Sequence, residues 1–221
     1  MATTEQPFAL RLLLTCGAIA PPLFIAVFLL AGATRADYNP LHHPVSSLSM
    51  GDLGWLQSAS FILTGSLLLA FAVGLRLAPR WPGGSLWGPL LVGMVAIGLI
   101  GAGVFINDPL NGYPPGTPPV PAERTLHGRL HDLFGIPVFL GLPIACLVFG
   151  RLFRRLGRPR WAAYSVLSGI AMLTAFVLAG MGFSQVAGFA DLAGLFQRVS
   201  LAFGLGWVAL LAVHMLRATR A

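Results

Sequence analysis

Long apolar runs separated by short polar segments fill this chain of 221 residues. A helix needs about 20 apolar residues to cross a bilayer, and a window of that length predicts six such helices. They fall near residues 10–34, 53–77, 86–107, 126–150, 161–186 and 192–216. The segments between them are too short for a separate soluble domain. We therefore expect an all-α fold, with a single six-helix transmembrane domain over residues 1–221.

The composition agrees with this pattern. Hydrophobic residues make up 56% of the chain and charged residues 10%, whereas a soluble domain carries charge at about a quarter of its positions. The two cysteines, Cys16 and Cys146, lie within apolar runs and are too few for a disulfide framework. We interpret them as packing residues in an integral membrane protein.

The distribution of charge predicts the orientation. With the N-terminus inside, ten of the 14 basic residues, all of them arginine, fall on the inner side against Glu5 alone, a balance of +9. The outer side holds four arginines against six carboxylates, a balance of −2, and the two sides give the formal charge of +7. This split follows the positive-inside rule, so we expect both termini in the cytoplasm. It also explains the basic composition without any nucleic-acid partner.

Half of the inner arginines lie in one turn, between the fourth and fifth predicted spans. They are Arg151, Arg154, Arg155, Arg158 and Arg160. A cationic cluster beside the membrane gains about 1 kcal/mol per charge from anionic lipid, so one interpretation is a lipid-binding site. The other is that the cluster only sets the topology. In either case the expected partners are membrane lipids.

Residues 125–135 concentrate the polar chemistry of the outer side. His127 and His131 are four residues apart, so on a helix their imidazoles lie on one face, one turn apart. Asp132 follows directly. Ionisable groups at the mouth of a membrane span are costly to place there, which makes the segment a candidate functional site.

Two other outer segments carry groups of the same kind. His42, His43 and Ser47 follow the first span, and Asp108 follows the third. A carboxylate at the C-terminal end of a helix faces the negative end of the helix dipole. We therefore expect Asp108 to need a cation, a histidine or a metal as its partner.

These residues together match the ligands of a catalytic zinc site, which uses three protein ligands and one water. His127 and His131 would supply two ligands, and His43 or Asp108 the third. Asp132 would then orient an imidazole through its second nitrogen. A haem held by two histidines is disfavoured, because the sequence has no attachment motif and no second histidine pair.

Two functions remain open at this stage. In the first, a zinc-dependent hydrolase acts on a lipid or another amphiphile, with bound water as the nucleophile, Asp108 or Asp132 as the base, and Ser47 as polar support. In the second, which we favour slightly, the polar groups form a structural network and the protein is a non-enzymatic lipid-binding or scaffolding component. The sequence does not decide whether the protein is an enzyme, and it does not give the oligomeric state.

Three segments resemble the domain-of-unknown-function 998 (DUF998) family of bacterial and archaeal six-span membrane proteins. They are the proline-rich run 108–118, the histidine segment 126–132, and His-Pro-Val-Ser-Ser-Leu at 43–48. The resemblance covers nearly the whole chain and implies a multi-pass protein of the plasma membrane. It implies no activity.

The ligand set is more distantly similar to that of the alkaline-ceramidase and progestin-receptor superfamily of zinc-dependent membrane hydrolases. On that likeness the matching positions are His43, Ser47, Asp108, His127 and His131. That superfamily has seven spans with the paired histidines on the last, whereas here the pair opens the fourth of six.

Overall fold

The computed structural model describes residues 8–78 and 86–218, and within these ranges the chain is helical between irregular loops. The long helices are α1 (Phe8–Thr34), α2 (Gly54–Leu77), α3 (Trp87–Val104), α4 (Leu126–Ile136), α5 (Leu142–Arg155), α6 (Pro159–Phe183) and α7 (Ala193–Ala218). Three short turns are η1 (Val45–Ser49), η2 (Pro137–Gly141) and η3 (Ala190–Leu192). Six helical stretches are long and apolar enough to cross a membrane, which confirms the predicted all-α, six-span fold.

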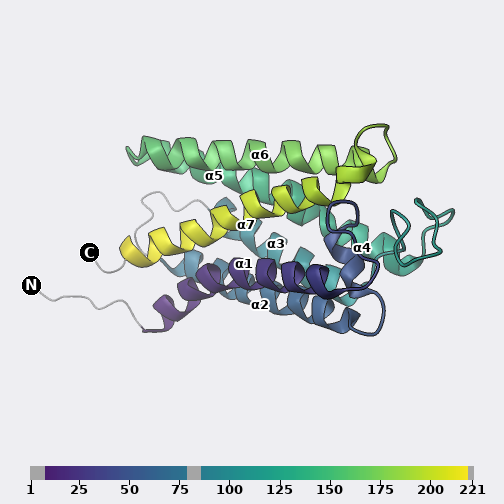
Figure 1. The fold of residues 1–221 in the computed structure, drawn as a ribbon. Helices are drawn as coiled ribbons and strands as arrows, with labels where there is room; N and C mark the ends of the chain where they lie inside the picture. The colour runs from purple at the N-terminus through teal and green to yellow at the C-terminus, as the bar shows by residue number, and fades with distance from the viewer. Residues whose placement is uncertain (1–7, 79–85, 219–221) are drawn as a thin grey trace, which may run out of the picture.

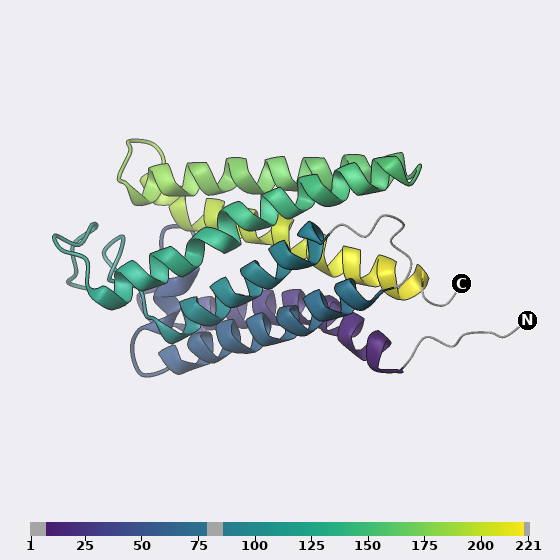
Figure 2. The same ribbon diagram turned by 180° about the vertical axis from the view of Figure 1, so that it is seen from behind.

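The six spans form a closed ring in which each packs on the next. In this ring α1 packs on α2, α2 packs on α3, and α3 packs on the fourth span through α4, η2 and α5. α5 packs on α6, α6 packs on α7, and α7 packs on α1. Figures 1 and 2 show the two faces of this bundle. A ring of this kind lets each helix bury one side against protein while the other side faces lipid.

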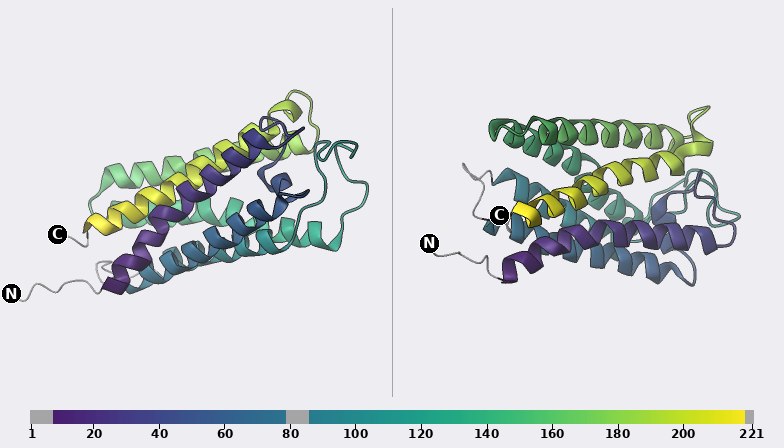
Figure 3. Two further views of the ribbon diagram at one scale, coloured as in Figure 1. Left: turned by 60° about the horizontal axis from the view of Figure 1, so that its bottom comes forward. Right: turned by 60° about the vertical axis from the view of Figure 1, so that its left-hand side comes forward.

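The two ends of the bundle differ. The start of α1, the end of α7 and the α5–α6 turn lie at one end, which we call the arginine end (Figures 1 and 3). The long loops after α1 and α3 and the shorter loop after α6 lie at the opposite end, which we call the outer end. Both described ends of the chain are therefore on one side, as six crossings require.

The fourth span, Leu126–Arg155, is not one regular helix. α4 leads into the π-helical turn η2, and α5 continues from it. Pro137 and Pro143 lack backbone N–H groups and cannot donate to the carbonyls four residues earlier, so a wider turn here accommodates both. Within η2, Phe139 stacks on Phe176 of α6 with ring centroids 4.3 Å apart. The turn thus carries the span from α3 across to α6.

Large side chains from most of the helices fill the core of the bundle, and Trp207 of α7 is one of them. Trp207 is fully buried, its Nε1 donates to Ser165 Oγ at 3.0 Å, and its ring lies 5.4 Å from that of Phe149. Cys146 is buried and Cys16 partly buried, both as free thiols, which supports their interpretation as packing residues.

The third span ends earlier than expected. α3 stops at Val104, and Phe105 takes an extended conformation, so residues 105–108 leave the helix rather than finish it. Asp108 consequently does not face the C-terminal dipole of α3. This difference changes how the outer residues are partnered.

Candidate functional site

A buried arginine organises the outer end. Arg198, in the first turns of α7, has 9% of its surface exposed, and its Nη1 donates to the carbonyls of Pro40 (2.6 Å), His43 (3.0 Å) and Gly194 (3.0 Å). Its Nη2 donates to the phenol oxygen of Tyr38. Each of these acceptors is neutral. Arg198 therefore fastens the loop after α1 to α7 through dipoles and not through an ion pair.

Tyr38 extends the same contacts along that loop. Its hydroxyl donates toward the carbonyls of Pro44 (3.0 Å) and His43 (3.2 Å), and its ring lies 5.5 Å below the Arg198 guanidinium. Burial raises the pKa of Tyr38, and the Arg198 charge opposes that rise. The phenol is thus held neutral beside the cation.

His43 is buried next to these groups. Its Nδ1 accepts the backbone N–H of Asn39 at 2.9 Å, so Nδ1 is not free to bind a metal. Burial, with smaller contributions from the nearby His42 and Arg198, lowers the pKa of His43 to about 4. The imidazole is therefore neutral at pH 7 and serves as a hydrogen-bond acceptor for its own loop.

Asp108 has a partner other than those expected. Its Oδ1 accepts the Thr125 hydroxyl at 2.6 Å and its Oδ2 accepts the Thr125 backbone N–H at 3.0 Å. Thr125 in turn caps α4 by accepting the Gly128 N–H at 3.0 Å. The carboxylate thus sits at the positive end of the α4 dipole. Among the described residues the partner of Asp108 is therefore Thr125 and not a cation or a histidine, because α3 ends before Asp108 and α4 begins against it.

The two paired histidines lie on α4 as predicted, but only one is buried. His131 Nδ1 faces the carbonyls of Phe105 (2.7 Å) and Ala102 (3.1 Å) at the end of α3. Both are acceptors, so Nδ1 carries the hydrogen. His127 is exposed, and its ring lies edge-on to Phe105 with centroids 5.6 Å apart. His131 therefore ties α4 to α3 through the backbone.

Asp132 also has a partner that the sequence analysis did not foresee. Its Oδ2 lies 3.3 Å from Nη1 of Arg124, and both side chains are partly exposed. This ion pair replaces the expected contact with an imidazole, and an exposed pair of this kind contributes little to stability.

The proposed zinc ligands His43, His127 and His131 are not brought together. Across residues 8–78 and 86–218, no three histidine, cysteine, aspartate or glutamate side chains converge on a point where a metal could bind. The three imidazoles have different surroundings: His43 is buried in the loop after α1, His131 is buried against the end of α3, and His127 is exposed on α4. The structure gives the predicted metal site no support.

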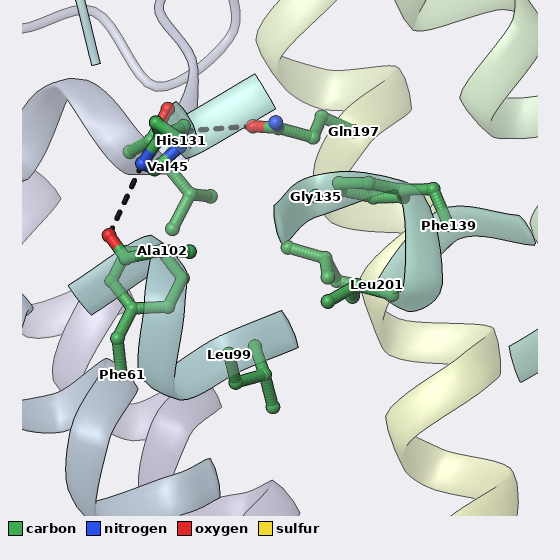
Figure 4. Close-up of a pocket in the computed structure, with 11 residues that line it drawn as sticks. Val45, Phe61, Leu99, Ala102, His131, Gly135, Phe139, Gln197 and Leu201 are labelled. Carbon is green, nitrogen blue, oxygen red and sulfur yellow. Dashed lines mark hydrogen bonds between the residues drawn. The ribbon is translucent and has the colours of Figure 1, made fainter. Parts of the chain in front are cut away.

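A small cavity lies beneath these residues, between η1, α3, α4 and α7 (Figure 4). Its polar lining comes from Ser46, His131 and Gln197, and Gln197 is fixed there because its Oε1 accepts the Val45 N–H at 2.7 Å. The rest of the lining is apolar. The volume of about 40 Å³ is room for a few water molecules and is far too small for a lipid chain.

One polar group of residues was missed from the sequence. Gln57, Ser60 and Thr64 form a buried stripe on α2, and in the described part of the chain their side chains have no hydrogen-bond partner. Ser47, predicted as a catalytic support, is fully buried in η1 and likewise has no partner there. Gln57, Ser60 and Thr64 are three and four residues apart in an apolar span, and this spacing could have predicted that they share one face of the helix.

The five arginines of the α5–α6 turn are all exposed. They lie at the arginine end, the opposite end of the bundle from the outer polar residues (Figure 1). Within residues 8–78 and 86–218, Arg158 differs from the other four in having a side-chain partner: its Nη1 donates to His214 Nε2 on α7 at 2.6 Å. His214 in turn packs against Trp161, with ring centroids 4.3 Å apart. Arg158 thus holds the turn against α7.

Comparison with known proteins gives one match. The family described as "Protein of unknown function (DUF998)" matches residues 18–214, nearly the whole ring of spans. No curated protein and no solved structure matches the chain. Six apolar helices and a family match of this length agree with the resemblance seen in the sequence, and the chain belongs to the DUF998 family.

Proposed function

We propose that this protein is a non-enzymatic, lipid-binding scaffold of the plasma membrane whose outer end is closed by a structural polar network. The network consists of Tyr38, His43, Asp108, Thr125, His131 and Arg198. One observation carries the proposal: Asp108, His131 and Arg198 are each hydrogen-bonded to the backbone of another segment, and Tyr38 and His43 to the backbone of the loop that Arg198 holds.

Those bonds are what a structural role requires. Asp108 joins the end of the third span to the start of the fourth, His131 joins α4 to the last carbonyls of α3, and Arg198 joins α7 to the loop after α1. Both Asp108 oxygens accept from Thr125, so the carboxylate is directed at the start of α4, and it is not among the residues that line the cavity beside His131. The cavity beside His131 also lacks the volume for an amphiphilic substrate.

Paired carboxylate variants test the structural role. Asp108→Asn removes the charge that accepts two hydrogen bonds at the α4 terminus, and we expect it to cost about 1–3 kcal/mol of unfolding free energy. Asp132→Asn removes an exposed charge of the same sign farther along α4 and should cost less than about 1 kcal/mol. Thermal unfolding of the full chain in mild detergent measures both.

The opposite ranking would contradict the proposal. If Asp108→Asn left the melting temperature unchanged while Asp132→Asn lowered it, the carboxylate at 108 would not be holding the spans together. If both variants melted like the parent, but the parent hydrolysed an added lipid and Asp108→Asn did not, the zinc-hydrolase alternative would replace the scaffold.

A further inference from the structure

A second hollow lies at the arginine end, at the junction of α5 and α6. It measures about 450 Å³, and we call it the arginine crevice. Arg151 and Arg154 of α5 form its polar side, and Gly150, Ala162, Ala163 and Val166 form its apolar side. It is about ten times the volume of the cavity beside His131.

Small residues shape this crevice. A Cβ added at Gly150 would lie 2.9 Å from Val166 Cγ2 and 3.3 Å from the Ala162 carbonyl, so α5 and α6 touch closely at this level. Beyond it the helices end in the turn, and the alanines leave open the space that larger side chains would fill. An apolar floor with a cationic rim results.

The two arginines of the crevice are suited to a phosphate. They are three residues apart on α5, so they lie on one face, and each guanidinium offers a planar fork of donors. Neither forms an ion pair within residues 8–78 and 86–218, where the carboxylates belong to the loops and helix ends of the opposite side. An anionic ligand would therefore not have to displace a carboxylate of the described chain.

The start of α6 adds to the positive potential. Pro159, its first residue, lines the crevice, and Arg158 at the N-cap position makes no side-chain capping bond. The positive end of this 25-residue helix consequently faces the same space as the two guanidinium groups. The α6 N-terminus and the two arginines together favour the binding of an anion in the crevice.

We propose that the arginine crevice binds the phosphate of an anionic phospholipid, with the guanidinium groups of Arg151 and Arg154 on the headgroup and the apolar floor against the lipid's glycerol and upper acyl chain. The inference rests on the proposed lipid-binding function and names its site. The floor favours a lipid over free phosphate, because a hydrated ion gains nothing from Ala163 and Val166. Basic pockets between spans at a membrane surface bind lipids of this class.

The five arginines of the turn supply a matched pair of variants. Arg151→Gln with Arg154→Gln removes both crevice cations, and Arg155→Gln with Arg160→Gln removes two exposed cations of the same turn that do not line it. The probe is short-chain phosphatidylglycerol, titrated into the full chain in mild detergent, with phosphatidylcholine and inorganic phosphate as comparisons. We expect the crevice double variant to weaken phosphatidylglycerol binding about 10- to 30-fold and the control double variant by about threefold or less.

A variant that changes the shape of the crevice, but not its charge, tests the site independently of the arginine variants. Ala163→Phe fills the apolar side while leaving all five arginines in place, and Ala163 is exposed, so the bundle should tolerate the change. It should weaken phosphatidylglycerol binding to a similar degree. The melting temperature without lipid should stay within a few degrees of the parent's for every variant used.

Three outcomes would overturn the inference, and they differ in whether the proposed lipid-binding function is also lost. Equal weakening by both double variants would mean diffuse attraction to the whole turn, which leaves the scaffold proposal standing without this site. Inorganic phosphate competing as well as the lipid would make it an ion site. Failure of the parent protein to bind either phosphatidylglycerol or phosphatidylcholine would remove the crevice and the lipid-binding function together.

Discussion

At the scale of single residues, the outer end shows how charged side chains are stabilised inside a membrane protein without partners of opposite charge. Arg198 is surrounded by carbonyl and hydroxyl oxygens, and Asp108 by the N–H and hydroxyl of Thr125. Oriented dipoles replace the solvation that burial removes. His43 follows the same rule as a neutral acceptor.

The neutral state of His43 predicts a pH dependence. Its pKa is about 4 in the folded protein and about 6.5 in an unfolded chain, so between these values the unfolded chain binds a proton that the folded chain does not. Stability should therefore be highest above pH 6.5 and fall as the pH is lowered toward 4. The groups that face His43 are His42, Tyr38, Tyr113 and Arg198.

The variant His43→Asn should flatten this dependence, because an amide oxygen accepts the Asn39 N–H without titrating. We expect the melting temperature of the parent to drop more between pH 7 and pH 4.5 than that of the variant. His127→Asn, at an exposed position, should follow the parent. Parallel curves for the parent and His43→Asn would show that His43 does not cause the loss.

At the scale of elements, the six spans could be predicted from the hydropathy of the sequence alone. The partners of Asp108, His131 and Arg198 could not, because they depend on tertiary contacts. Six spans follow from hydropathy because the bilayer sets helix length. Asp108 was assigned the wrong partner because Thr125 lies 17 residues away and meets it only when α4 packs on α3. The acceptors of Arg198 and His131 are backbone carbonyls, which every residue has and no sequence pattern marks.

Two glycines of α4 offer a sharp comparison of this packing. A Cβ at Gly128 would overlap the Asp108 carboxylate, whereas a Cβ at Gly135 would meet nothing within 4 Å. We expect Gly128→Ala to cost about 1–3 kcal/mol of unfolding free energy, through overpacking and loss of the Asp108–Thr125 contact. Gly135→Ala should be neutral or stabilising by up to about 1 kcal/mol, since alanine favours the helix. Equal stabilities for the two variants in a thermal unfolding experiment would contradict the described α3–α4 contact.

At the scale of the whole molecule, the ring of spans separates two chemically different ends. The outer end holds the polar network and the described carboxylates, and the arginine end holds the crevice and both described ends of the chain. This separation fits the charge balance of +9 against −2 calculated from the sequence. On the positive-inside rule, we propose that the arginine end faces the cytoplasm.

Reporter fusions test that orientation. A reporter that is active only in the cytoplasm, fused after Ala221, should be active, and one that is active only outside the inner membrane should be silent at the same position. The same pair inserted in the loop after α3 should give the reverse result. Activity of the external reporter after Ala221 would invert the assignment and place the arginine crevice in the opposite leaflet.

We propose that the outer histidines and carboxylates hold the spans together and do not hold a metal. Elemental analysis of the full chain, purified in mild detergent without chelator, tests this most directly. We expect well under about 0.1 equivalent of zinc or any other transition metal in the parent, and His131→Ala should lower the melting temperature without changing the metal content. About one equivalent of zinc in the parent, lost in His131→Ala, would contradict the claim and support the hydrolase.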